Sequence, residues 1–131
     1  MHDEAPRRRG SWQAKFHHAF RGMKRGLRGD SSFFVHLFMA AAVAMAGLAL
    51  KVTLVEWCLL ILCVAGVLAA EMFNTALERL AQAVDQRPND HLRDALDMGS
   101  AAVLLAALGA VAVGTTVFVY RLGLLLSWWE A

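Results

Sequence analysis

The chain has 131 residues, of which 58% are hydrophobic and 18% charged, with a net charge of +2 and a mean hydropathy of +0.46. A water-soluble domain of this size needs more polar residues, because small domains have much surface for their volume. The composition therefore excludes an ordinary soluble protein, and the long apolar blocks indicate a chain surrounded by lipid.

Residues 1–10 are polar, contain Pro6 and a run of three arginines, and are expected to form a disordered basic N-terminus. The remaining residues, 11–131, are expected to form a single membrane-embedded domain. Residues 11–28 predict an amphipathic helix, because apolar side chains recur at spacings of three and four with basic side chains between them. A basic amphipathic helix beside a membrane span usually lies in the headgroup layer, so we expect a phospholipid bilayer as partner and no nucleic acid.

Three apolar stretches follow this helix, at about residues 33–50, 52–73 and 98–120. Each comes near the roughly 20 residues that an α-helix needs to cross the hydrocarbon of a bilayer. The predicted fold is therefore an all-α membrane protein, in which an N-terminal amphipathic interfacial helix precedes three transmembrane helices.

The basic residues are distributed unevenly about these spans. Most of the chain's 13 Lys and Arg residues precede the first span, whereas the turn after it offers only Lys51 and the C-terminal tail only Arg121. Three more lie between the second and third spans: Arg79, Arg87 and Arg93. Cytoplasmic segments carry the excess of basic residues. We therefore expect the N-terminus and the 79–97 connection in the cytoplasm, and the C-terminus on the periplasmic or external side.

Polar residues interrupt the apolar pattern at the cytoplasmic end of the second span. Glu71, Asn74 and Glu78 are spaced i, i+3 and i+7, which places them on one helix face within about two turns. Carboxylates at the membrane surface are unfavourable unless they pair, bind a metal ion or face water. Oxygen ligands of this kind suit Mg²⁺ bound together with substrate phosphates. The alternative is structural: Glu78 is solvated, or pairs with a basic residue such as Arg79 of a neighbouring copy.

A second polar set, Asp94 and Asp97, precedes the small residues Gly99 and Ser100 at the start of the third span. Acidic side chains near a helix N-terminus are favoured by capping and by the helix dipole, so this pair alone does not indicate chemistry. The small residues allow a close approach between helices. His36, near the cytoplasmic end of the first span, is interpreted as a packing or interfacial residue.

Two motifs, EMFNTALE at 71–78 and LDMGSAAVLL at 96–105, resemble the signature of the prokaryotic diacylglycerol kinase family, which also includes undecaprenol kinases. The resemblance covers about residues 14–120 and includes FHHAFRGM at 16–23. It implies a homotrimer in the bacterial inner membrane, with active sites at subunit interfaces. It also implies ATP- and Mg²⁺-dependent phosphorylation of a membrane lipid hydroxyl at the cytoplasmic surface. The acceptor would be diacylglycerol, giving phosphatidic acid, or undecaprenol.

The family's functional residues map onto the polar face of the second span. By this resemblance Glu71 is the general base that takes the proton of the lipid hydroxyl, and Asn74 positions groups around the γ-phosphate. Glu78 would hold Mg²⁺ together with Asp30, the acidic residue before the first span. Phosphoryl transfer needs these same parts, because it depends on in-line positioning, neutralised phosphate charge and a carboxylate near the attacking hydroxyl.

Other positions match the family in part. Asp97 corresponds to the Asp of the family's Lys-Asp pair, and Lys15 falls where a basic residue that contacts the nucleotide is expected. The Lys of the pair is Leu96 here, the family Asp after the second Glu is Gln82, and Asp30 is shorter than the usual Glu. Arg93, one turn before Leu96, is a candidate to supply the missing charge. The loss of a charge-stabilising donor leaves a second hypothesis, a catalytically silent member that binds lipid or nucleotide or regulates a partner.

Overall fold

The computed structural model describes residues 11–29, 31–84, 87 and 89–128, and their regular structure is entirely helical. It consists of four α-helices in the order α1 (Trp12–Gly29), α2 (Ser31–Ala49), α3 (Leu54–Val84) and α4 (Asp90–Leu125). The prediction of an all-α fold is confirmed. The N-terminus at 1–10 and Asp30 lie outside the described residues, so the predictions made for them stay predictions.

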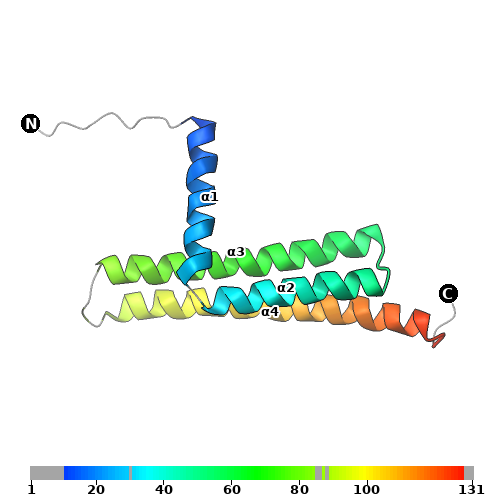
Figure 1. Cartoon of the computed structure of the whole chain (residues 1–131). Helices are drawn as coiled ribbons and strands as arrows, with labels where there is room; N and C mark the ends of the chain where they lie inside the picture. Colours follow the sequence, from blue (N-terminus) through cyan, green and yellow to red (C-terminus); the bar gives the residue numbers. More distant parts are fainter. Residues whose placement is uncertain (1–10, 30, 85–86, 88, 129–131) are drawn as a thin grey trace, which may run out of the picture.

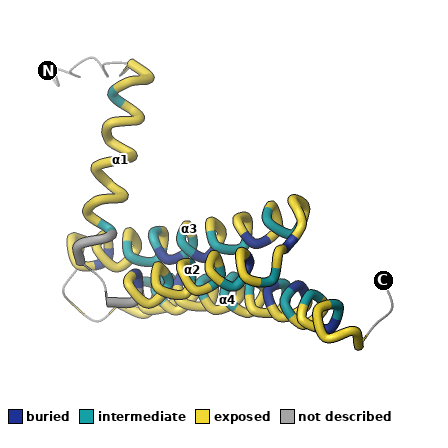
Figure 2. Tube along the Cα trace, turned by 45° about the vertical axis from the view of Figure 1, so that its right-hand side comes forward, coloured by how far each residue is buried: buried dark blue, intermediate teal, exposed yellow. Residues whose placement is uncertain are grey.

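Helices α2, α3 and α4 lie side by side, whereas α1 projects from them at a steep angle (Figure 1). The C-terminal end of α1 contacts the C-terminal half of α3. Arg79 donates from Nη2 to the backbone oxygen of Arg25 over 3.3 Å. A Cβ atom placed on Gly26 would lie 3.6 Å from Cε of Met72. Most of α1 is exposed (Figure 2), including the apolar side chains of Trp12 and Phe16. Its apolar stripe therefore has no cover from the described part of this chain.

Two helices are long and apolar enough to cross a membrane: α3 and α4. The core helix of a soluble protein would be mostly buried, but only 17% and 6% of the most apolar stretches of α3 and α4 are buried. These two exposed apolar helices agree with two of the predicted spans. The first predicted span corresponds to α2, whose apolar part, Phe33–Ala49, is shorter.

The helices are held together mainly by contact between α3 and α4. Three of the four buried residues of α4 are glycines, at positions 99, 114 and 123. Gly99 lets the two helices approach closely, because a Cβ there would lie 3.1 Å from Cδ1 of Leu77 on α3. A glycine also serves this purpose in α2, because a Cβ on Gly47 would lie 2.7 Å from the ring of Trp57 on α3. The buried apolar side chains of Val52, Leu60 and Val117 form a cluster, and Trp57 packs against it.

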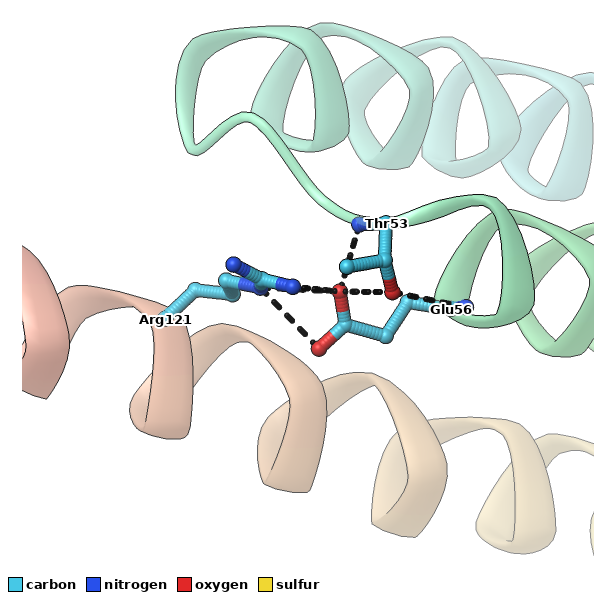
Figure 3. Close-up of polar contacts among 3 residues, drawn as sticks. All are labelled: Thr53, Glu56 and Arg121. Atoms are coloured by element: carbon cyan, nitrogen blue, oxygen red, sulfur yellow. Dashed lines mark hydrogen bonds and ion pairs between the residues drawn. The ribbon is translucent and has the colours of Figure 1, made fainter. Parts of the chain in front are cut away.

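An ion pair joins the first turn of α3 to the last turns of α4 (Figure 3). Arg121 donates from Nε to both oxygens of Glu56, over 3.0 and 2.8 Å, and its Nη2 lies 2.7 Å from Oε2. The same carboxylate accepts from the backbone nitrogen and hydroxyl of Thr53, over 2.6 and 2.8 Å. The Thr53 hydroxyl in turn accepts from the nitrogen of Glu56 over 3.4 Å. This reciprocal pattern is a capping box, which satisfies free N–H groups at the start of α3.

The Glu56–Arg121 pair is not among the sequence-based predictions, which used Arg121 only to orient the chain. Its side chains are 15% and 19% exposed, so it is more sheltered than an ordinary surface pair. The sequence does carry a signal for the cap, because Thr53 and Glu56 have the Thr-x-x-Glu spacing of a capping box. It carries no signal for the partner 65 residues later.

Candidate active site

The buried carboxylate of Glu71 is the centre of the polar face on α3. Glu71 is the one charged residue buried in the described part of the chain, and its side chain is only 4% exposed. His36 on α2 lies beside it, with Nε2 at 3.6 Å from Oε1 of Glu71. A carboxylate in such a place is unfavourable unless polar groups surround it, so a functional use is a reasonable expectation.

Asn74 and Glu78 continue this face towards the cytoplasmic end of α3. Asn74 donates from Nδ2 to Oε1 of Glu78 over 2.9 Å. Glu71 is buried, Asn74 half-buried and Glu78 exposed. The spacing predicted one shared face, and the structure shows that this face runs from the interior of the bundle to solvent. Such a gradient suits a site where a lipid from the membrane meets a water-soluble nucleotide.

Gly99 on α4 is packed against this face. A Cβ atom on Gly99 would lie 2.6 Å from Oδ1 of Asn74 and 3.1 Å from Cδ1 of Leu77. Oδ1 of Asn74 is buried and has no hydrogen-bond partner within the described residues. The Asn74 side chain is therefore held between Glu78, which takes its amide hydrogen, and the surface of α4 at Gly99.

We expect Gly99→Ala to destabilise the fold and displace Asn74, because the added methyl group would meet Oδ1 well inside contact distance. Overpacking of this kind typically costs about 1–3 kcal/mol. The free energy of unfolding in detergent micelles measures the effect. Gly109→Ala on the same helix is the matched control, since a Cβ there meets nothing within 4 Å. The control should be neutral or stabilising by up to about 1 kcal/mol. Equal effects at the two positions would contradict close packing at Gly99.

The acidic groups fit part of a magnesium site. Glu78 is an exposed carboxylate, and Asn74 places an amide beside it. In the described part of the chain no group of three or more His, Cys, Asp or Glu side chains is arranged to hold a metal ion. Mg²⁺ usually takes one or two carboxylates and completes its shell with waters and substrate phosphates. Glu78 fits that role, and its predicted companion Asp30 lies outside the described residues.

The remaining predicted site residues are not brought to this face within one chain. Lys15 is exposed on the part of α1 that projects from the bundle, with Nζ 4.7 Å from the ring centre of Trp12. Arg93 is exposed and pairs with Asp90 one turn away, with 2.7 Å between Nη2 and Oδ1. Asp97 is exposed and lies two positions before Gly99. Because two residues turn an α-helix by about 200°, Asp97 points away from the face that Gly99 turns to α3.

An apolar cavity of about 450 Å³ lies among α2, α3 and α4. Its lining repeats at helical spacing on α2 and on α3, and His36 is the one titratable side chain in it. The lining residues are Val35, His36, Met39, Ala40, Val43, Val64, Val67, Leu68, Ala107, Ala110, Val111, Gly114, Thr115 and Phe118. A second cavity, of about 440 Å³, lies between α3 and α4 beside Asn74. Both are open grooves lined almost wholly by apolar side chains, which suits hydrocarbon.

Two residues beside the predicted site make contacts that the sequence did not indicate. His36 was interpreted as a packing or interfacial residue, and the structure puts its ring against Glu71. Gly99 was expected only to allow close helix packing, and the structure puts it against Asn74 in particular. Neither contact follows from spacing, because each joins residues on different helices.

Comparisons with known proteins identify the family to which this chain is similar. The family model described as prokaryotic diacylglycerol kinase matches residues 17–118. An undecaprenol kinase of Bacillus subtilis is 27% identical over 107 residues, which are 82% of this chain and 87% of the relative. A diacylglycerol kinase of Synechocystis sp. is 32% identical over 116 residues, which are 83% of this chain and 66% of the relative. No solved structure matches the chain significantly.

Proposed function

The chain belongs to the prokaryotic diacylglycerol kinase family, and from this premise we propose that it transfers the γ-phosphate of ATP to the hydroxyl group of a membrane lipid. Relatives named undecaprenol kinase and diacylglycerol kinase support lipid phosphorylation as the reaction. The observation that carries the proposal is the face on α3, within the matched residues. There a buried carboxylate, an amide and an exposed carboxylate lead from the bundle interior to solvent.

The roles of these residues follow from what phosphoryl transfer requires. The lipid oxygen forms a bond to the γ-phosphorus as the bond to the ADP oxygen breaks, and the hydroxyl proton must leave. Glu71 is the base that receives this proton, because it is the buried carboxylate nearest the membrane interior on this face. Asn74 orients the phosphate, and Glu78 with Asp30 holds Mg²⁺. The bound ion neutralises phosphate charge and orients the phosphates.

We place this reaction at the cytoplasmic surface of a bacterial membrane. The exposed apolar surfaces of α3 and α4 and the family support a membrane location. The proposed arrangement has three spans, formed by α2, α3 and α4, with α1 in the headgroup layer. Most basic residues precede α2, so the N-terminus and the 79–97 connection would face the cytoplasm of the inner membrane, and the C-terminus the periplasm or exterior.

A homotrimer would complete the site. Within one chain Lys15 lies on the projecting helix α1 and Asp97 on the exposed side of α4. We propose that both contact the nucleotide across a subunit interface, where α1 and α4 of one copy meet the α3 face of the next. The exposed apolar surfaces along the bundle leave room for such contacts.

The reaction is tested with purified protein in liposomes and γ-labelled ATP. Label should pass to diacylglycerol, to undecaprenol or to both, and a chelator of divalent cations should stop the transfer. A protein that is folded yet labels neither lipid would overturn the proposal. The comparison of the two lipids also identifies the acceptor.

The second candidate function is a silent, lipid-binding or regulatory member of the family, which Leu96 favours. Leu96 is half-buried where the family carries a Lys. If only this charge is missing, Leu96→Lys should raise kcat on the order of 100-fold, the usual effect of one charge-stabilising donor. Leu96→Met, similar in size and uncharged, is the control. Equal activity of the two variants would show that another cation, such as Arg93, already serves the phosphates.

A further inference from the structure

His36 lies between the apolar cavity and the buried carboxylate of Glu71. The imidazole of His36 lines the cavity, whereas Glu71 is not part of its lining. The His36 side chain is 21% exposed and that of Glu71 only 4%. With Nε2 at 3.6 Å from Oε1 of Glu71, the ring has one nitrogen turned to the carboxylate. The ring therefore belongs to the wall of the cavity and also contacts Glu71.

The cavity leads along the helices to this pair. On α2 the lining runs from Val43 back to His36, and on α3 it runs from Val64 through Leu68. Glu71 is the next position of the α3 stripe, three residues after Leu68. On α4 the lining extends from Ala107 to Phe118, about 16 Å along the helix axis.

This length suits one hydrocarbon chain of a lipid. A bilayer has a hydrocarbon core of about 30 Å, so one leaflet contributes roughly half of it, about 15 Å. An acyl or isoprenoid chain that fills the cavity would place its polar end at the one titratable group of the lining, His36. The apolar walls and the single polar end match an amphiphilic alcohol.

We propose that His36 is a catalytic residue that relays the hydroxyl proton of the lipid acceptor to Glu71, while the acceptor's chain occupies the cavity among α2, α3 and α4. This inference rests on the proposed lipid kinase function. The acceptor oxygen bonds to the γ-phosphorus, the bond to the ADP oxygen breaks, and the hydroxyl proton passes to Nδ1 of His36. The proton on Nε2 passes to the Glu71 carboxylate, so the proton balance closes on Glu71.

The arrangement is that of a histidine–carboxylate pair, in which the buried acid orients the ring and the ring meets the substrate. The 3.6 Å separation is slightly longer than a hydrogen bond, and such catalytic contacts commonly tighten when substrate binds.

The first test replaces His36 in the liposome assay. His36→Ala should lower kcat on the order of 100-fold, the usual contribution of an acid–base group, with little change in KM for ATP. His36→Asn should be equally slow, because an amide donates a hydrogen bond but does not relay a proton. Added imidazole should restore activity to the Ala variant. Wild-type activity in either variant, or no rescue of a normally helical His36→Ala protein, overturns the relay.

The second test fills the cavity. Gly114 lines it, and a Cβ there meets nothing within 4 Å, so Gly114→Leu should raise the KM for the lipid several-fold without forcing the helices apart. Gly109→Leu, on the same helix and outside the cavity lining, is the matched control and should leave that KM unchanged. An unchanged lipid KM in Gly114→Leu would show that something else, such as a helix of a second copy, occupies the cavity. If the wild-type protein labels no lipid at all, the proposed function fails. If the wild-type protein is active and the His36 variants are equally active, only the relay fails.

Discussion

Glu71→Gln is expected to abolish phosphoryl transfer to the lipid while the helical fold persists. Glutamine has nearly the same shape as glutamate but does not accept the hydroxyl proton, so kcat should fall by about 10²–10⁴-fold. The side chain is only 4% exposed, and a neutral amide is easier to bury than a carboxylate. Stability in detergent should therefore be unchanged or higher. The labelled-phosphate assay and circular dichroism measure the two effects separately.

The control for Glu71→Gln is Asp94→Asn, which removes the same charge from an exposed carboxylate on α4 outside the proposed site. Its kcat should stay within a few-fold of wild type. A Glu71→Gln protein that keeps more than a tenth of the wild-type kcat would remove Glu71 from the role of base. The proton would then have to leave by another group on the α3 face.

The second large effect is expected at the Glu56–Arg121 pair. Glu56→Gln or Arg121→Gln should each lower the free energy of unfolding markedly, because each leaves a charged partner without its counter-charge beside apolar helices. Glu56→Gln keeps an amide oxygen to accept from Thr53 in the cap of α3, so the loss reports mainly on the ion pair. The double variant should be less destabilised than the sum of the two single variants, because the second replacement removes the stranded charge.

The Asp90–Arg93 pair provides the comparison for this effect. It has the same 2.7 Å separation as the closest contact between Arg121 and Glu56, but its side chains are 86% and 71% exposed. Exposed ion pairs contribute little to stability, so Arg93→Gln should have several times less effect than Arg121→Gln. Unfolding of the variants in mixed micelles measures the difference. Similar losses at the two pairs would mean that the Glu56–Arg121 pair is no more sheltered than a surface pair.

Several features of this protein could be predicted from the sequence because they are local. A single long apolar segment that crosses a membrane forms a helix, because the helix satisfies the backbone hydrogen bonds within the segment itself. The spacing of Glu71, Asn74 and Glu78 determines that they share a face wherever α3 forms. The match to a family pattern depends on the same local spacing, and the family model covers it.

The contacts between helices depended on the tertiary structure. The ring of His36 lies against Glu71, Gly99 against Asn74, and Arg121 against Glu56 only because α2 and α4 pack on α3 in one particular register. Helical periodicity predicts which residues share a face of one helix. It does not predict which neighbouring helix packs against that face, or how far the two helices are shifted along their axes. The sequence by itself therefore determined the helices, the polar face of α3 and the family. The packing of α2, α3 and α4 decided how that face is buried and that a histidine of the cavity lining lies against its carboxylate.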